Sequence, residues 1–255
     1  MMAYLIAILS LSIIASVTAI LDSEVVEKHS IPYQADLIID FPDSETLYRT
    51  GTLISSNYVL TAANCVVGSS NITVVMGVYN VEVKDEPTRR TYTGVSYTAS
   101  PLYNGNKGRD DIAVIRLNRP SEINEYIQLA KLPRYSDKYT SLIGKVARVS
   151  GWGNVDSNSD LEHSILRYAN ITIRDHSECQ PQFQQTSIGQ LCSTHTDKLF
   201  EVSDIGAPLV LGKVQIGIAA VTNIVNGKEQ SPQIYTRIGR YLRWLDDTTD
   251  ANIKE

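Results

Sequence analysis

Short runs of apolar and β-branched residues recur along the chain after residue 20, and turn-forming residues separate them. Runs of this length and spacing are typical of an all-β sandwich or barrel. The expected strands are Gln34–Ile39, Tyr58–Thr61, Ile72–Met76, Ile112–Leu117, Val146–Val149 and Val214–Ile218. The 14 tyrosines and the plentiful valine, isoleucine and threonine favour the same fold class.

One segment near the C-terminus has a helical pattern instead. Its apolar residues are Ile238, Tyr241, Leu242 and Leu245. Their spacing of 0, +3, +4 and +7 predicts a helix with one apolar face. Arg237, Arg240 and Arg243 lie in the same segment. Basic residues at this spacing on a final helix are more typical of a solvated face than of a binding site.

The length and charge of the chain exclude some classes of function. Its 255 residues can form one large domain or two tightly joined halves. The net charge of −5 gives no electrostatic reason to expect nucleic acid as a partner. Beyond the N-terminal region no segment holds the roughly 18 apolar residues of a membrane span, so we expect no membrane association.

Residues 1–19 have the pattern of a signal peptide. An apolar stretch from about Tyr4 to Ala15 precedes Val17-Thr18-Ala19, a small-residue cleavage pattern. The alternative is a buried N-terminal helix. Cleavage after Ala19 predicts a secreted, extracellular chain that begins at Ile20.

In a secreted chain, sequons can be glycosylated and cysteines can form lasting disulfides. Asn71 and Asn170 each begin an Asn-Ile-Thr sequon, which makes both candidate glycosylation sites. The chain has three cysteines, Cys65, Cys179 and Cys192. An odd count in a secreted protein indicates a free thiol or an intermolecular bridge.

Six segments, in order and at the right spacing, resemble the trypsin/chymotrypsin-like serine proteases. They are Pro32-Tyr33-Gln34, Leu53 to Cys65, Asp111 to Leu117, Gly151-Trp152-Gly153, Ser203 to Leu209 and Ile234 to Arg237. The resemblance implies an all-β chymotrypsin fold: two six-stranded antiparallel β-barrels with a C-terminal α-helix and the site in the cleft between the barrels. It assigns residues 20–246 to the protease domain and 247–255 to a C-terminal tail, and it implies no cofactor and no metal.

The same resemblance implies a degenerate catalytic triad. The family's histidine, aspartate and serine positions are Asn64, Asp111 and Ile205. Acyl transfer in this family needs a hydroxyl nucleophile and an imidazole base. An amide and a hydrocarbon supply neither, so we expect no catalytic residue and a chain that is not an enzyme. Asp111 either accepts a hydrogen bond from Asn64 or serves as a polar cap that its strand requires.

The resemblance also implies a remodelled cleft. Ser203 replaces a glycine whose N–H stabilises the oxyanion in the family. The other altered positions of the specificity pocket and its walls are Leu199, Phe200, Gln233, Ala220, Val221 and Thr222. Phe200 and Gln233 are expected to narrow or close the pocket.

Three further roles follow from the resemblance alone. The freed amino group of Ile20 inserts and pairs with Asp204, or Asp204 is solvated or paired elsewhere. Cys179 and Cys192 form a disulfide, and Cys65 is a free, buried thiol because its family partner is here Arg49.

The leading hypothesis for function is a secreted, proteolytically inactive homologue that acts by binding proteins. Among known protein groups, the chain most resembles the inactivated serine protease paralogues of parasitic mites such as the scabies mite. Those paralogues are related to dust-mite trypsin-like allergens. That likeness implies release into the gut lumen and immune evasion through binding of host complement components. The alternative is a non-catalytic cofactor or adapter in an arthropod immune protease cascade. The third reading is an active serine endopeptidase.

Overall fold

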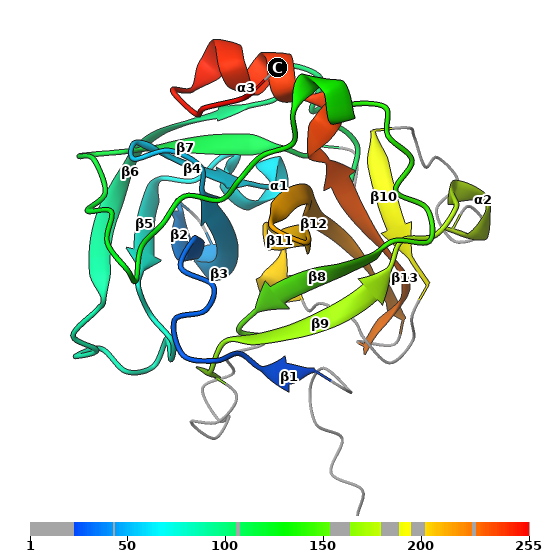
Figure 1. Ribbon diagram of the computed structural model, residues 1–255. Coiled ribbons are helices and arrows are strands. Elements are labelled where there is room, and N and C mark those ends of the chain that lie inside the picture. The colour runs from blue at the N-terminus through cyan, green and yellow to red at the C-terminus, as the bar shows by residue number, and fades with distance from the viewer. Residues whose placement is uncertain are drawn as a thin grey trace, which may run out of the picture.

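A computed structural model describes residues 23–42, 44–105, 108–153, 164–179, 189–194, 202–225 and 228–254. Two antiparallel β-sheets form the framework of this part of the chain, and they pack side by side (Figure 1). Within these ranges no helix has the length and apolar character needed to cross a membrane.

The first sheet is a closed six-stranded barrel in the order β2-β3-β4-β7-β6-β5. Its strands are β2 (Gln34–Phe41), β3 (Ser44–Leu53), β4 (Tyr58–Thr61), β5 (Asn71–Met76), β6 (Arg90–Ala99) and β7 (Ala113–Leu117). Alternate residues of β2, namely Ala35, Leu37 and Ile39, are fully buried in the barrel core. Because strand side chains alternate between two faces, this period places the apolar set inside. The expected strand Tyr58–Thr61 is confirmed to the residue.

The second sheet has seven strands in the order β1-β9-β8-β11-β12-β13-β10. They are β1 (Glu24–Val25), β8 (Val146–Gly151), β9 (Arg167–Thr172), β10 (Gln190–Ser193), β11 (Pro208–Leu211), β12 (Val214–Val225) and β13 (Lys228–Arg237). A six-stranded barrel was expected here. The two-residue β1 adds an outer strand on β9, and one isolated bridge from Arg174 to Cys192 brings the chain after β9 back to β10. The chymotrypsin-like architecture is therefore confirmed, with the second sheet joined at its ends by that single bridge.

The C-terminal helix is present but starts later than predicted. A helix was expected from Ile238, whereas the structure has a 3-10 turn, η4 (Ile238–Arg240), followed by α3 (Leu242–Thr248). Gly239 is a poor helix former, and Tyr241 leaves helical geometry with φ −115° and ψ 11°. Leu242 and Leu245 are buried in the core of the first barrel, which α3 covers (Figure 1).

The residues after α3 pack on the same barrel. Ala251 is buried in its core and Ile253 packs against it. The N–H of Tyr135 donates to the carbonyl of Lys254 at 3.0 Å. The segment from residue 247, expected as a tail, is thus the end of α3 and a packed extension.

Buried hydrogen bonds join the two sheets. The side chain of Gln34 in β2 donates to the carbonyl of Ser150 in β8 at 2.7 Å and accepts from the Ser150 hydroxyl at 2.5 Å. The Thr236 hydroxyl in β13 donates to the carbonyl of Asp111 at 2.8 Å. Because buried polar groups cost free energy when unpaired, these bonds specify how the sheets meet.

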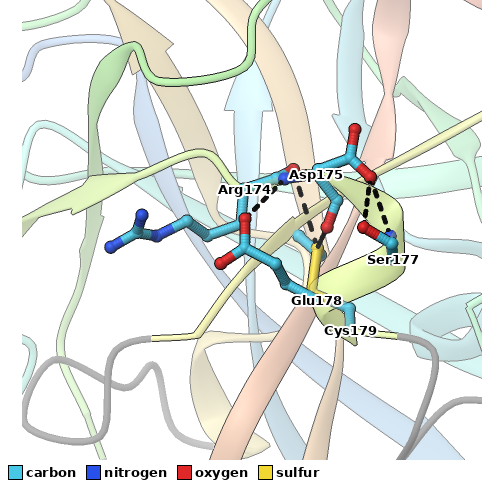
Figure 2. The surroundings of a disulfide bond; sticks show 6 residues. Arg174, Asp175, Ser177, Glu178 and Cys179 are labelled. Carbon is cyan, nitrogen blue, oxygen red and sulfur yellow. Dashed lines mark hydrogen bonds between the residues drawn. A yellow bond between two sulfur atoms is a disulfide. The ribbon is translucent and has the colours of Figure 1, made fainter.

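A disulfide closes a short loop in the second sheet. It joins Cys179, at the end of α2 (His176–Cys179), to Cys192 in β10. Figure 2 shows its surroundings, where the carboxylate of Asp175 accepts from the N–H of Ser177 at 2.9 Å and from its hydroxyl at 2.7 Å. Asp175 thereby caps the short helix that carries Cys179.

Replacing Cys179 and Cys192 together by alanine is expected to lower the free energy of unfolding by about 3 kcal/mol, since a loop of this length loses its cross-link in the unfolded state. Chemical denaturation of the double variant beside the parent protein measures the change. Cys65→Ala is the matched control, since it removes a thiol that forms no disulfide. An unchanged unfolding midpoint in the double variant would contradict the expected role.

Candidate functional site

The three triad positions meet where the two sheets face each other. Asn64 lies in α1 (Ala63–Val66), Asp111 directly precedes β7, and Ile205 follows the 3-10 turn η3 (Val202–Asp204). The first two belong to the first barrel and the third to the second sheet. The fold therefore brings together the positions that the sequence predicted.

Asn64 is held by two acceptors. Its side-chain amide donates to Oδ2 of Asp111 at 2.6 Å and to the carbonyl of Ala220 at 3.1 Å. Its backbone N–H donates to Oδ1 of Asp111 at 2.8 Å. Both amide protons and both carboxylate oxygens are thus used, which fixes the Asn64 side chain against Asp111 and β12.

Asp111 is fully buried, and its carboxyl group is surrounded by amides. Burial raises the pKa of Asp111 from 3.8 to about 7, and the hydrogen bonds from the N–H groups of Asn64 and Ala63 and from the Asn64 side chain limit the rise. Because desolvation dominates, the carboxyl group takes up a proton far more readily than an exposed aspartate does.

Ile205 packs against the cores of both sheets. Its carbonyl accepts the N–H of Thr50 at 3.0 Å, which ties β3 to the turn. The next residue, Gly206, has a φ of 93°. A Cβ there would lie 1.9 Å from the carbonyl oxygen of Thr50 and 2.4 Å from Oγ1 of Thr61. Only glycine fits this close approach, so the backbone of the turn is retained around a hydrocarbon side chain.

Ser203 and Asp204, the last two residues of η3, directly precede Ile205. The Ser203 hydroxyl donates to the carbonyl of Gly153 at 2.5 Å. Asp204 is buried and accepts the N–H of Gly153 at 3.0 Å. A Cβ on Gly151 would lie 1.9 Å from Oδ1 of Asp204, which explains the first glycine of the Gly-Trp-Gly segment. The predicted partner of Asp204, Ile20, lies outside the described residues.

The predicted pocket positions are described in part. Gln233 in β13 is fully buried, at the register position between Ser193 of β10 and Thr222 of β12. Ala220 and Val221 are also buried. Leu199, Phe200 and the side chain of Thr222 lie outside the described residues. A glutamine side chain therefore fills space on the wall where the resemblance places a glycine.

Cys65 is a free thiol in the described part of the chain, fully buried behind Asn64. Burial raises its pKa to about 12. A buried thiol that stays protonated at neutral pH is a poor nucleophile.

Both sequons are exposed. Asn71 begins β5, and its side-chain amide donates to the carboxylate of Asp40 at 2.9 Å. Asn170 lies on the outer face of β9.

Two supporting contacts were missed from the sequence. The carbonyl of Ala220 is the second acceptor of Asn64, and the Thr236 hydroxyl donates to the Asp111 carbonyl. Both partners are more than a hundred residues away along the chain. The segment that contains Thr236 matches the family motif, but the acceptor of the Thr236 hydroxyl, the carbonyl of Asp111, is apparent only in the folded chain.

The chain is similar to known proteases along nearly its whole length. The family described as Trypsin matches residues 20–245. A chymotrypsin of Phaedon cochleariae is 35% identical over 228 residues, 89% of this chain and 80% of that protein. Brachyurin of Leptuca pugilator is 30% identical, covering 87% of this chain and 94% of that protein. The solved structure of a collagenase, HL collagenase, aligns with a TM-score of 0.79 at 24% identity, over 92% of this chain and all of that one, and shows the fold.

These relatives correct one expectation. The sequence led us to expect that the chain is not an enzyme, whereas the relatives matched over most of its length are named as proteases. The expectation was drawn from the side chains at Asn64 and Ile205, and the comparisons extend over the whole fold. The supported statement is membership in a family of serine proteases.

The carboxyl group of Asp111 predicts an unusual pH dependence of stability. Its pKa is raised on folding, so its contribution is complete below pH 4 and is lost as the pH rises to about 7. The loss is expected at up to about 1.4 kcal/mol per pH unit in that window. Asp111→Asn should abolish this component, which denaturant unfolding at pH 4 to 8 measures. Asp36, whose pKa burial also raises, is present in both proteins and cancels in the comparison. Equal pH slopes for the two proteins would contradict the assignment.

Proposed function

The chain belongs to the trypsin family of serine proteases, and we propose that it acts by binding a protein partner after secretion. In this proposal Asn64, Asp111 and Ile205 join the two sheets of the scaffold. The observation that carries it is the packing of Ile205 against both cores, at the position where the family places its nucleophile.

The chemistry of the site supports this proposal. Acyl transfer in the family begins with a hydroxyl group activated by an imidazole. At these positions the side chains are the hydrocarbon of Ile205 and the amide of Asn64, whose protons are donated to Asp111 and Ala220. A neutral amide has no basicity near neutral pH.

Neighbouring groups are engaged elsewhere. The Ser203 hydroxyl donates to Gly153. Of the two histidines in the described residues, His29 packs edge-on against the ring of Tyr126 and His176 begins α2. His163 and His195 lie outside the described residues. No described imidazole stands next to a hydroxyl of this site.

The cleft wall gives a second line of support. Gln233 is buried where the resemblance expects a glycine, and Ala220 uses its carbonyl for Asn64. These changes reduce the room and the backbone groups offered to a substrate. A scaffold of this kind acts through its surface, because function resides in sites and not in the fold.

Secretion is supported by the N-terminal signal pattern and by the disulfide between Cys179 and Cys192. The resemblance to the inactivated protease paralogues of parasitic mites supplies the candidate partners, host complement components. We propose these as the first partners to test.

Recombinant mature protein, immobilised and exposed to host plasma, is expected to enrich complement components and to release them uncleaved. Mass spectrometry of the eluate identifies the proteins, and their masses show whether they are intact. Brachyurin with a covalently blocked active site is the control scaffold of the same fold. Failure to enrich any plasma protein over that control would refute binding, and enrichment without complement would refute the named partner. Recovery of cleaved partner would contradict the proposed role of the site.

Restoring the family's triad by Asn64→His with Ile205→Ser is expected to leave hydrolysis of small ester and amide substrates near background, because Gln233 still fills the pocket wall. Adding Gln233→Gly provides the matched variant in which that obstruction is removed. Initial rates with arginine, phenylalanine and alanine esters measure the effect. Robust hydrolysis by the double variant, without Gln233→Gly, would show that Gln233 does not obstruct the pocket.

A further inference from the structure

A small apolar cavity lies on the second sheet, away from the triad positions. Its volume is about 220 Å³, and its apolar walls are Leu142, Leu211, Val214 and Ile216. Pockets for drug-sized ligands usually hold about 300–1,000 Å³. This cavity is smaller and matches one apolar side chain of a partner, the kind of pocket in which interface anchors sit.

Cationic side chains border this cavity. Arg237 lines it and donates from Nη2 to the carbonyl of Lys138 at 3.1 Å and to that of Thr140 at 2.7 Å. Burial lowers the pKa of Arg237, and the charge of Arg240 lowers it further, which places the two guanidinium groups within electrostatic reach. The segment of η1 (Tyr135–Asp137) thereby lies beside the end of β13 (Figure 1).

An exposed aromatic ring extends this border. Tyr139 is 75% exposed. The ammonium group of Lys138 lies 5.2 Å from the centre of its ring, and the guanidinium of Arg240 lies 6.0 Å from it. Tyrosine and arginine, here Tyr139 and Arg240, are residue types enriched at protein interfaces, and Lys138 adds a second positive charge beside them.

The carboxylates nearest to this border are engaged. Asp137 lines the cavity and accepts the N–H of Arg134 at 3.3 Å. In α3, Asp246 accepts the hydroxyl of Tyr135 at 3.5 Å and Asp247 pairs with Arg243 at 3.8 Å. Among the described residues, no carboxylate forms an ion pair with Lys138, Arg237 or Arg240.

The cavity together with its border of Lys138, Tyr139 and Arg240 is called the groove below. We propose that this groove binds an acidic peptide segment of a partner protein. One apolar side chain of the segment would sit in the cavity, and its flanking carboxylates would pair with Lys138 and Arg240. The inference rests on the proposed function, since the occupant is part of a bound protein. Charge complementarity carries it: a chain of net charge −5 presents here a cluster of cations that form no ion pair with any carboxylate of the described ranges.

The probe is a fluorescein-labelled peptide in which one phenylalanine is flanked on each side by two glutamates. Fluorescence anisotropy at low salt is expected to show saturable binding that weakens as salt is added. Two matched peptides carry serine in place of the phenylalanine or lysines in place of the glutamates. Both are expected to bind at least about tenfold more weakly, since each lacks one of the two contacts.

The charge contact is tested by Lys138→Glu with Arg240→Glu. This variant should lose about tenfold or more in affinity for the glutamate peptide and gain affinity for the lysine peptide. Arg116→Glu, on the exposed face of β7, is the matched charge reversal away from the groove and should change neither affinity.

The apolar contact is tested by Val214→Phe, which fills the cavity. It should weaken the phenylalanine peptide about tenfold and leave the serine peptide unchanged. Thermal unfolding of every variant verifies that it is folded.

The outcomes separate this inference from the proposed function. Equal affinity for all three peptides would contradict the proposed peptide binding by the groove. So would an affinity for the phenylalanine peptide that Val214→Phe leaves unchanged. Tight binding of a sulfated polysaccharide that depends on Lys138 and Arg240 but not on Val214 would make the surface a polyanion site and would also overturn it. Plasma partners captured equally by the parent and by both groove variants would leave the proposed function standing and place its surface elsewhere.

Discussion

The contact of the two sheets at residue 205 determines the geometry of everything around the candidate site. The Ile205 carbonyl is bonded to Thr50 of the first barrel, and its side chain packs into both cores. Gly206, with a φ of 93° and no room for a Cβ, allows the chain to make this turn close to Thr50 and Thr61. The turn is thus determined by backbone and glycine. A hydrocarbon can therefore occupy the nucleophile position without disturbing how the sheets pack.

The buried carboxyl group of Asp111 depends on this arrangement. In the part of the chain that the structure describes, no cation forms an ion pair with it, and its two oxygens accept hydrogen bonds from the backbone and side-chain amides of Asn64. A buried polar group that keeps its hydrogen bonds avoids most of the penalty of burial, although the charged form remains costly. The Asn64–Asp111 pair is therefore a satisfied polar contact between α1 and β7, anchored across the interface by Ala220.

Whole-chain similarity and local chemistry answer different questions about this protein. Identity of 35% over most of the chain reports the fold and the family. The side chains at the triad positions report what groups are available for chemistry, and the groove near Tyr139 reports what the outer surface offers to a partner. Binding by the surface draws on residues that no catalytic motif includes, which is why the proposals for function rest on contacts and charges.

The sequence by itself determined the class of fold and the identity of the site residues. Short runs of apolar and β-branched residues predicted β4 to the residue and most of β2, β5 and β7. The motifs that carry the family resemblance named Asn64, Asp111 and Ile205 before any contact was known. The strand β6 was not predicted, because its sequence is mostly threonine, serine, glycine and tyrosine and contains no run of apolar residues. The start of α3 was displaced, because Gly239 and Tyr241 interrupt the helix.

Only the tertiary structure decided that Ile205 bridges two cores, that Ala220 anchors Asn64, and that the segments around residues 138, 214 and 237 form one groove. These features join residues far apart in the chain, and burial and hydrogen bonding between such residues exist only once both sheets are packed.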